Sequence, residues 1–522
     1  MKRLTGAARR VSLATLVSRV LGLFRDALRA ALVGAGALSD ALEVAFKVPN
    51  LLRDLFAEGA FNGAFVPTLS QTQKDEGEEA AFDLVNRALS TLLIYAGGAV
   101  VLLVVFAPQL IGWITDPSFS GDPEKFETAV FYARLLAPFL LFITLAVVLM
   151  GALNVRGRFF LPALSPASQN LLLVGGGSFL LMLGVTGESA AFPWALLLLT
   201  GGALQFLLQV PAMRREGWRP RFCPDPKFRD PALRQIVLRM APVVLGLAAT
   251  HLCILINLRL ASQYVGGVSF LYYGFRLVHL PVGLVGVAVG TAALAEAARQ
   301  AAAGDREAVA RTMGDGLRLC LAFAIPAAVG LMVLGGPIAH LLFGYGATEA
   351  AEANAIGQAI TLYALAVVPY CAVKVLVPVY YAVGKMRVPL LASVFAVAAN
   401  LAVAIPLARN PDFQWRALAI AVGAGQAVNL LILMVAGRRH FLAGRPGFLA
   451  AVVKMAAAAC ACGGATWAVS LLLPGGEGFL ARAAAVFGPT VAGVAAYFAV
   501  GRLLGSQEIL AVVRLDRSGN AS

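Results

Sequence analysis

The sequence predicts an all-α polytopic membrane protein, and two observations support this fold class. Apolar stretches long enough to cross a bilayer recur along all 522 residues, with short polar breaks between them. The composition is 59% hydrophobic and only 13% charged, whereas soluble domains carry about 25% charged residues. A soluble domain of useful size is therefore excluded. A transmembrane β-barrel is excluded too, because its alternating segments of about 10 residues are missing from the sequence.

The hydropathy pattern predicts fourteen transmembrane helices. The first follows a basic N-terminus and could be read as a cleaved signal peptide. Arg19 and Arg25 interrupt its apolar stretch and no small-x-small cleavage site follows, so an uncleaved helix is favoured. The expected spans are residues 11–33, 38–70, 86–114, 128–153, 162–184, 192–213, 234–262, 269–299, 312–342, 355–383, 388–407, 416–437, 448–473 and 480–504.

Alternate connections between these spans differ in basic charge, which sets the expected orientation. The basic side holds the Lys and Arg residues of 1–10, 156–158, 214–229, 385–387 and 438–445, together with Arg306, whereas the connections on the other side are poor in Lys and Arg. The positive-inside rule then places both termini in the cytoplasm. The acidic loop expected at 71–85 is assigned to the same side, because acidic residues weigh little in this rule. The rule also accounts for most of the net charge of +14, so nucleic acid is not an expected partner.

A weak internal repeat suggests two homologous halves. GRFFLP at 157–162 and GKMRVP at 384–389 share Gly, a base and Pro at matching positions, 227 residues apart. Pro49 and Pro281 lie 232 residues apart. Two six-helix lobes would produce this offset, with a substrate site between them, although chance similarity among Pro-rich helix starts is the alternative. The expected division is 1–215 and 216–440 for the two lobes and 441–522 for two further helices and a tail.

The first two expected helices carry many charges within an apolar helical pattern. Each charge at a bilayer centre costs roughly 2.5–3.5 kcal/mol on translocon scales. A chain keeps such residues when they face water, a partner or a ligand, so we expect a charged cavity at membrane depth. The charged residues are Arg19, Arg25, Asp26, Arg29, Asp40, Glu43, Lys47, Arg53, Asp54 and Glu58.

In the second helix the polar residues follow a helical spacing of 3, 4, 3, 4 and 4. The spacing puts Asp40, Glu43, Lys47, Asn50, Asp54 and Glu58 on one face. Glu43 and Lys47 are expected to pair at i,i+4, and Pro49 to kink the helix. Purely structural salt bridges between helices are the alternative. They are less favoured, because the basic residues outnumber the acids available to neutralise them.

Later helices add Arg276, Arg259 and Lys374, of which Arg276 lies most centrally in its apolar pattern. Arg259 and Lys374 could instead snorkel or pair locally. Arginine forks match phosphate oxygens with two hydrogen bonds, so several arginines at membrane depth indicate an anionic, phosphate-bearing head group. His279, one turn from Arg276, is a candidate cavity residue. The Walker A, HExxH and Gly-x-Ser-x-Gly motifs do not occur, which argues against an enzyme.

Five segments resemble the MurJ (MviN) lipid II flippases. They are SRVLGLFRD (18–26), GAGALSDALEVAFKVPNLLRDLFAEGAFNGAFVPTLSQ (34–71), LNVRGRFFLPALSPASQN (153–170), YYGFRLVHLPVGLVGVAVGT (272–291) and VKVLVPVYYAVGKMRVP (373–389). The resemblance implies the fold of the multidrug/oligosaccharidyl-lipid/polysaccharide exporter superfamily. That fold has fourteen helices, two six-helix lobes, a cationic central cavity and a lipid-tail groove formed by the last two helices.

The resemblance also implies residue roles. Arg19, Arg25, Arg53 and Arg276 match the family's essential cavity arginines and would bind the pyrophosphate. Further lining or gating positions are Asp26, Asp40, Asn50, Glu58, Ser269 and His279. The sequence departs from the family at Phe275, His279 and Ala295. Some members bind sodium; Asn257 and Asn400 remain as possible ligands here, but Ala396 replaces a side-chain ligand, so no metal and no cofactor is expected.

The expected function is a transporter that flips lipid II from the cytoplasmic to the outer leaflet of the bacterial inner membrane. It would work as a monomer by alternating access, with the membrane potential as a possible driving force and the cell-wall synthesis machinery as possible partner. Exporters of another polyprenyl-linked glycan remain an alternative. A cationic-drug exporter would show a net acidic cavity instead. A membrane glycosyltransferase would need a carboxylate-bearing loop, whereas the longest connection, about 214–233, is basic and Pro-rich.

Overall fold

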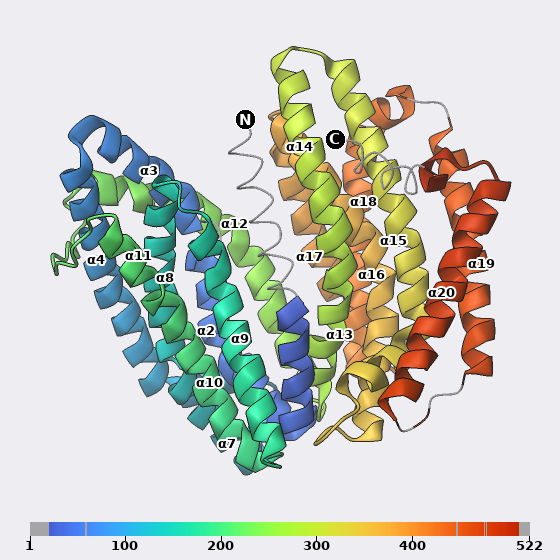
Figure 1. The fold of residues 1–522 in the computed structure, drawn as a ribbon, viewed down its shortest axis with the longest axis horizontal. Coiled ribbons are helices and arrows are strands. Elements are labelled where there is room, and N and C mark those ends of the chain that lie inside the picture. Colours follow the sequence, from blue (N-terminus) through green and yellow to red (C-terminus); the bar gives the residue numbers. More distant parts are fainter. Residues whose placement is uncertain (1–19, 58–59, 445–446, 474–475, 477, 511–522) are drawn as a thin grey trace. The chain divides into compact units, whose positions relative to one another are not determined.

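The computed structural model describes residues 20–57, 60–444, 447–473, 476 and 478–510, with the side chains at 55–57, 60, 245–249 and 439–444 outside that description. Within these ranges the regular secondary structure is helical and contains no β-strand (Figure 1). Residue contacts divide it into two compact units. The first extends to Ser269 and includes Tyr345–Thr348, and the second holds Phe270–Gly344 and the chain from Glu349 onward. The expected three-part division at residues 215 and 440 stays a prediction.

The first unit begins with the described part of the N-terminal helix, residues 20–33. Its longer helices pack around a core between α3, α4 and α8. The elements are α2 (Ala37–Ala57), α3 (Ala60–Glu76), α4 (Glu78–Val105), α5 (Ala107–Ile114), α6 (Pro117–Ser120), α7 (Pro123–Leu136), α8 (Pro138–Val155), α9 (Phe160–Met182), α10 (Glu188–Leu207), α11 (Gln209–Arg215) and α12 (Pro231–Ala261).

The second unit contains the longest helices of the described chain. The elements are α13 (Gly267–Pro281), the π-helix η1 (Val282–Gly286), α14 (Val287–Ala302), α15 (Arg306–Phe343), α16 (Ala350–Ala382), α17 (Arg387–Ala408), α18 (Arg416–Gly444), α19 (Phe448–Leu472) and α20 (Phe479–Leu503), of which α13 starts within the first unit. Helices α15 and α16 pack along each other, as do α17 and α18.

Each expected span that falls in the described residues coincides with helix. Ten helices there are long and apolar enough to cross a membrane by length and composition. Helix α2 is not among them, and it carries five charged residues. The prediction of an all-helical membrane protein is therefore confirmed.

The helix expected at 38–70 corresponds to α2, described to Ala57, and α3, described from Ala60, and residues 58 and 59 lie outside the described residues. One local prediction in the first unit is wrong. The loop expected at 71–85 is mostly helical: α3 runs to Glu76, α4 starts at Glu78, and only Gly77 separates them. Gly77 has φ +92°, a conformation that glycine adopts without steric cost. The polar composition of 71–85 thus marks exposed helix rather than loop.

Prolines explain interruptions inside three of the expected spans, 86–114, 128–153 and 269–299. Pro108 follows the junction of α4 and α5, and Pro138 follows the junction of α7 and α8. Pro281 is the last residue of α13 before the five-residue π-helical turn η1. Proline lacks a backbone N–H and its ring clashes with the preceding turn, so the helix continues only after a local adjustment. Pro49, by contrast, lies within α2, whose helical assignment runs through it.

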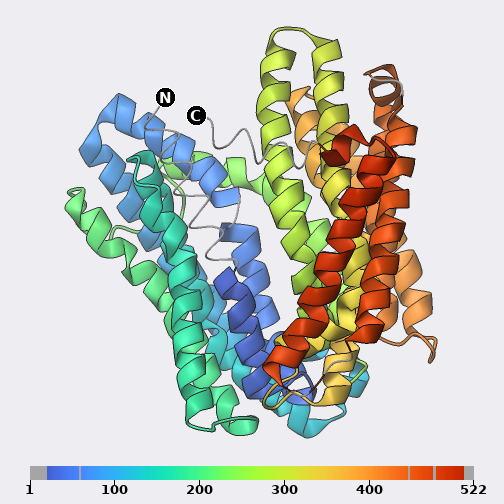
Figure 2. The same ribbon diagram turned by 45° about the vertical axis from the view of Figure 1, so that its right-hand side comes forward.

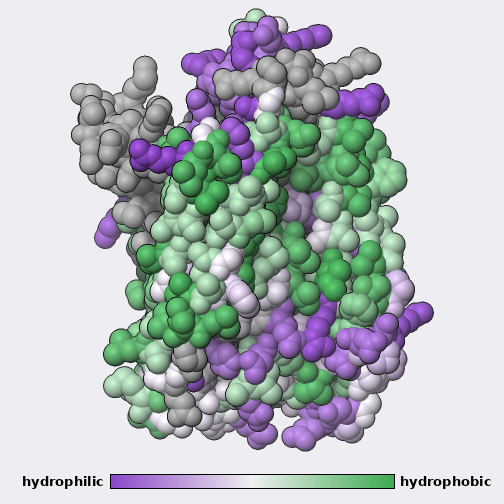
Figure 3. Space-filling model, turned by 90° about the vertical axis from the view of Figure 1, so that its right-hand side faces the viewer, coloured by the Kyte–Doolittle hydropathy of each residue, from purple (hydrophilic) through white to green (hydrophobic). Residues whose placement is uncertain are grey.

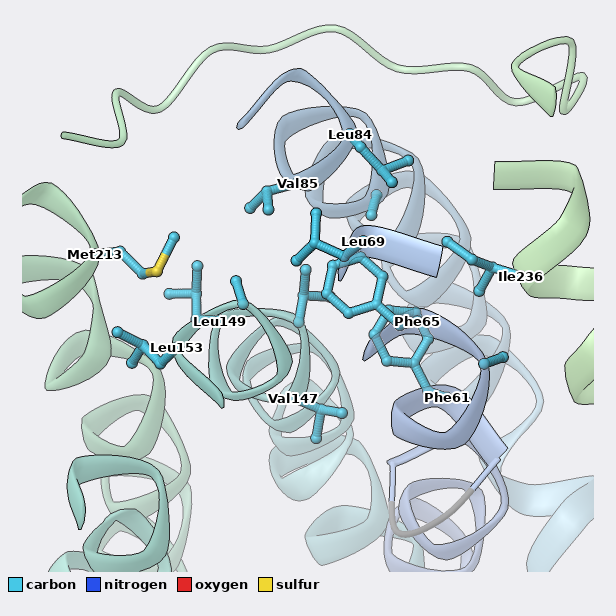
Figure 4. Packing of buried hydrophobic residues seen from close by; sticks show 14 of the residues in the cluster. Phe61, Phe65, Leu69, Leu84, Val85, Val147, Leu149, Leu153, Met213 and Ile236 are labelled. Atoms are coloured by element: carbon cyan, nitrogen blue, oxygen red, sulfur yellow. The ribbon is translucent and has the colours of Figure 1, made fainter. Parts of the chain in front are cut away.

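The core of the first unit is a cluster of interleaved aromatic and aliphatic side chains (Figure 4). Phe61, Phe65 and Leu69 of α3 face Val147 and its neighbours on α8. The rings of Phe61 and Phe65 stack at 4.8 Å between centroids. Gly151 of α8 lies so close that an added Cβ would be 2.8 Å from the Phe65 ring. This packing fixes α3 against α8.

The repeated motif ends two helices in the same way. After α8, Gly157 donates to the Asn154 carbonyl (3.0 Å) and Arg158 to the Leu153 carbonyl (2.9 Å). After α16, Gly384 and Lys385 make the corresponding bonds of 3.0 and 2.9 Å, to Tyr381 and Tyr380. Both glycines have positive φ, +71° and +73°. These are Schellman caps, which require a left-handed residue, so the repeat has a structural equivalent in both units.

Helices α19 and α20 of the second unit lie side by side (Figure 2), and both expose apolar side chains. Figure 3 shows apolar residues over the middle of this face, with hydrophilic residues gathered towards its two ends. Such a surface suits contact with lipid chains. The exposed residues include Leu449, Val453, Trp467, Leu471, Leu472, Phe479, Leu480, Phe487, Val491 and Val494.

Candidate functional site

Arg25 is held in place by two neighbours on different helices. Its Nε and Nη2 donate to Asp26 Oδ1 at 2.9 and 2.7 Å, and its Nη1 donates to Asn170 Oδ1 of α9 at 3.1 Å. The Asp26 side chain is fully buried, whereas 19% of the Arg25 side chain is exposed. A fixed guanidinium with one face left accessible can receive an anionic group. Arg25 and Asp26 therefore form a hydrogen-bonded ion pair, as their adjacency in the sequence indicates.

Arg53 forms a similar pair with the next residue in the chain. Its Nε and Nη2 donate to Asp54 Oδ1 at 3.1 and 2.7 Å, with 27% and 31% of the two side chains exposed. Asn50 lies one turn earlier and is half-buried. The predicted residues Arg19 and Glu58 lie outside the residues whose side chains the structure describes.

The polar face of α2 changes from buried to half-exposed along the helix. Asp40 and Glu43 are buried, whereas Lys47, Asn50 and Asp54 are half-buried. The expected pair of Glu43 with Lys47 is wrong. Glu43 instead pairs with Arg29 of the N-terminal helix, and Arg29 also donates to the Ser39 carbonyl at 3.2 Å. A buried guanidinium needs a counter-charge, and this need outweighs a weak pair within one helix.

Asp40 accepts hydrogen bonds from the start of α13. Its Oδ1 accepts from the backbone N–H and the hydroxyl of Ser269, both at 2.9 Å, and its Oδ2 accepts from the Gly266 N–H at 2.7 Å. Lys125 Nζ of α7 lies 3.4 Å from Oδ2. Asp40 and Ser269 are both fully buried. The first turn of a helix presents free N–H groups to an anion, so Asp40 caps α13 from another helix.

The segment Tyr345–Thr348 attaches to the end of the N-terminal helix in the same unit. Ala347 donates its N–H to the Ala31 carbonyl at 2.8 Å, and the Thr348 hydroxyl donates to the Ala30 carbonyl at 2.8 Å. Gly346 has φ +62°, and a Cβ added there would lie 2.2 Å from the Ala31 oxygen. The attachment adds donors to carbonyls in the last turn of that helix. Hydropathy alone gave no signal for it.

Arg276 and His279 lie on α13 in the second unit, just before the π-helical turn. Arg276 is half-buried and His279 is exposed. The His279 ring packs edge to face on the Phe275 ring, with 4.4 Å between ring centroids. The centroid of the Tyr370 ring of α16 lies 6.0 Å from that of His279. Single π-turns within helices often occur at functional sites. Close packing also fixes this region, because a Cβ at Gly290 would lie 2.3 Å from the Lys374 carbonyl oxygen.

Two further basic candidates have other surroundings. Arg259 donates to the Trp113 carbonyl at 2.7 Å and to the Thr115 carbonyl, at the end of α5. These partners are backbone carbonyls about 145 residues earlier in the chain, so the choice between snorkelling and local pairing stays open. Lys374 is exposed on α16.

Metal coordination has little support within the described chain. No group of three or more His, Cys, Asp or Glu side chains among those residues could hold a metal ion. Of the possible sodium ligands, Asn257 donates to Cys253 Sγ at 3.6 Å, and Asn400 is buried on α17. The expectation that this protein needs no metal or cofactor stays a prediction.

Solved structures of helical membrane proteins share the fold of this chain. The chain superposes on a structure described as "Lipid II flippase MurJ, inward closed conformation" with a TM-score of 0.75, covering 94% of this chain and 98% of the other at 22% identity. It also matches an inward-facing multidrug resistance MATE family transporter of the MOP superfamily, with a TM-score of 0.63, 15% identity and coverage of 84% and 98%.

Sequence comparison narrows the class to one family. The family model described as "Lipid II flippase MurJ" matches residues 29–485. The chain is 31% identical over 457 residues to the lipid II flippase MurJ of Burkholderia cenocepacia, covering 86% of this chain and 87% of the relative. It is 31% identical to the probable lipid II flippase MurJ of Vibrio cholerae, covering 97% of each. The chain belongs to the MurJ family of lipid II flippases, which are transporters and not enzymes.

Proposed function

We propose that this protein flips lipid II from the cytoplasmic to the outer leaflet of the bacterial inner membrane. The observation that carries the proposal is Arg25, an arginine within an apolar helix that is oriented by Asp26 and Asn170 and still partly exposed. Keeping such a charge at membrane depth is expensive, and a ligand with phosphate oxygens would repay that cost. Family membership supplies the substrate class.

In this proposal Arg19, Arg25, Arg53 and Arg276 bind the pyrophosphate of lipid II in a cationic central cavity. Guanidinium groups are suited to this because each can donate two parallel hydrogen bonds to phosphate oxygens. Asp26, Asn50 and Glu58 line or gate the cavity. Asp26 sets the direction of Arg25, as its bonds to Nε and Nη2 indicate. His279 lies one turn from Arg276 and would contact the sugar or the phosphate.

The fold in this proposal has fourteen membrane-spanning helices, in two pseudo-symmetric lobes of six and a final pair. The lobes rock between inward-open and outward-open states. Asp40 and Ser269 hold one of these states through their hydrogen bonds and separate in the other. The membrane potential can drive one step, at about 2.3 kcal/mol per charge per 100 mV. The polyprenyl tail stays in lipid beside the apolar faces of α19 and α20.

Both termini lie in the cytoplasm, as the basic connections favour. The protein acts as a monomer whose partners are lipid II, membrane lipids and the cell-wall synthesis machinery.

The test is complementation of a strain depleted of its own lipid II flippase. Arg25→Ala and Arg276→Ala variants should fail to support cell-wall synthesis although they reach the membrane. Growth with either variant would contradict the site. Native mass spectrometry with lipid II and a competing polyprenyl-linked glycan tests the substrate: preferential binding of the competing glycan would favour an exporter of that glycan instead.

A further inference from the structure

The connection between α11 and α12, residues 216–230, runs as an extended strap along α4 (Figure 1, green, beside α4). Asn86 of α4 begins the attachment. Its side-chain oxygen accepts from Trp218 Nε1 at 2.8 Å and from the Arg221 N–H at 3.2 Å, and its amide donates to the Arg219 carbonyl at 3.0 Å. One buried asparagine thus fastens three groups of the strap.

The attachment continues one turn further along the same face of α4. The Ser90 hydroxyl accepts from the Cys223 N–H at 3.1 Å, and Thr91 Oγ1 accepts from the Asp225 N–H at 2.9 Å. The Tyr95 hydroxyl then donates to the Pro226 carbonyl at 2.7 Å. Polar side chains of α4 therefore serve as the hydrogen-bonding partner that a neighbouring strand would supply in a sheet.

Proline occupies three strap positions that do not donate to α4, so these positions carry no N–H group. Residues 221, 223 and 225 donate their N–H groups to α4, and Pro220, Pro224 and Pro226 have none. Between residues 220 and 226 this leaves one further N–H, that of Phe222. A backbone with so few remaining N–H groups suits the edge of a membrane, where unsatisfied polar groups are costly.

The outer side chains of the strap combine an exposed aromatic ring with unpaired bases. Phe222 is 67% exposed, and Arg219, Arg221 and Lys227 are exposed. Within the described part of the chain these three bases form no ion pair. Of the strap's three acids, Glu216 pairs with Arg158 at 2.8 Å and Asp230 pairs with Arg87 at 2.9 Å, whereas Asp225 accepts from the Asp230 N–H at 2.8 Å. The free charge of the strap is therefore positive.

The helix that carries the strap is one of the candidate membrane spans. Next to the attachment it exposes Leu93 and Ile94, at 40% and 42%. A basic, aromatic segment against an apolar helix has the composition of an interfacial membrane anchor. The guanidinium and ammonium groups of the strap are charged hydrogen-bond donors that suit phosphate oxygens.

We propose that the strap lies in the head-group layer of the cytoplasmic leaflet and binds anionic phospholipids through Arg219, Arg221 and Lys227, with Phe222 inserted below the head groups. The leaflet assignment rests on the orientation given under the proposed function. Clusters of bases beside a membrane span attract anionic lipids, with each base strengthening the association roughly fivefold. None of these three bases is among the arginines proposed to bind lipid II.

The first test places a spin label at Phe222→Cys in the full chain, with the six native cysteines replaced, in nanodiscs containing phosphatidylglycerol. A label at Arg306→Cys, at the exposed start of α15, is the matched control. The label at 222 should be more accessible to oxygen than to a water-soluble nickel reagent, and the label at 306 should show the reverse. Equal access of the nickel reagent to both positions would overturn the proposal.

The second test measures the lipids that remain bound in native mass spectrometry after exchange between phosphatidylglycerol and phosphatidylcholine. The triple variant R219Q/R221Q/K227Q should lose the preference for phosphatidylglycerol about tenfold or more. The charge-preserving R219K/R221K variant and the distant R409Q variant should keep it. An unchanged preference in the triple variant, or a strap label buried against a captured acidic protein, would contradict a lipid site.

The two proposals fail in different ways. Lipid II translocation by the triple variant in vesicles without anionic lipid should equal that of the native protein. If the native protein moved no lipid II, the flippase proposal would fail and the spin-label result would stand.

Discussion

The Asp40 carboxylate of α2 accepts both the backbone N–H and the hydroxyl of Ser269, 229 residues later in the chain, at 2.9 Å each. Lys125 and the Gly266 N–H complete its surroundings. The two residues thereby join α2 to the first turn of α13. Asp40 thereby supplies acceptors for N–H groups at the start of α13.

Substituting Ser269 and substituting Asp40 should lower the free energy of unfolding by different amounts. Ser269→Ala removes one hydrogen bond and should cost about 1 kcal/mol. Asp40→Ala leaves the Lys125 ammonium buried without its counter-charge and should cost about 3–5 kcal/mol. The measurement is the free energy of unfolding in mixed detergent micelles. The double variant D40A/K125M should recover part of the loss, and equal losses for D40A and S269A would contradict this assignment.

A second prediction concerns Gly346, where the segment Tyr345–Thr348 meets Ala31. Gly346→Ala combines left-handed strain with a clash against the Ala31 carbonyl, so it should cost at least about 2 kcal/mol. Gly384→Ala is the matched control. It has a similar φ of +73° but no atom within 4 Å of an added Cβ, so it should cost about 1 kcal/mol. Thermal unfolding followed by tryptophan fluorescence compares them, and an equal shift in both variants would rule out the clash.

A third prediction separates charge from packing at Arg29 and Glu43. Glu43→Gln removes the carboxylate charge beside the buried Arg29 guanidinium and should lower the free energy of unfolding by about 3 kcal/mol or more. The double variant R29M/E43L replaces the pair by apolar side chains of similar size and should be close to neutral. The same unfolding measurement applies to both. A double variant as unstable as E43Q would mean that the pair does more than neutralise charge.

A fourth prediction tests how Asn170 positions Arg25. Asn170→Ala removes the bond to Nη1 but leaves Asp26 in place, so lipid II translocation should fall several-fold without loss of folding. Arg25→Lys keeps the charge but loses the guanidinium fork that contacts Asp26 and Asn170, so the translocation rate should fall much further. Rates in proteoliposomes decide between them. Full activity of Arg25→Lys would mean that only charge matters at this position.

Hydropathy predicted the helices well, because a membrane-spanning helix needs about 20 apolar residues and that length is visible in the sequence. The 3.6-residue spacing also predicted the polar face of α2, whose burial decreases from Asp40 to Asp54. The family motifs indicated which arginines to consider. The positions of Pro108 and Pro138 could have predicted the junctions inside two expected spans.

The partners of the charged residues could not be predicted. Glu43 pairs with Arg29 rather than Lys47, and Asp40 receives Lys125 and the start of α13. These contacts depend on how helices distant in the sequence pack, which periodicity within one helix does not report. The strap at 216–230 was expected only as a basic connection. Its pairing with Asn86, Ser90, Thr91 and Tyr95 needs the relative position of two segments about 130 residues apart.

The most direct test of the central claim is lipid II translocation in proteoliposomes reconstituted with the purified protein. The account predicts translocation by the native protein and by Arg409→Ala, an exposed arginine remote in sequence from the proposed site. It predicts no translocation above protein-free vesicles for Arg25→Ala and Arg276→Ala at equal incorporation. Native rates in both of these variants would contradict a role of the arginines in carrying the pyrophosphate.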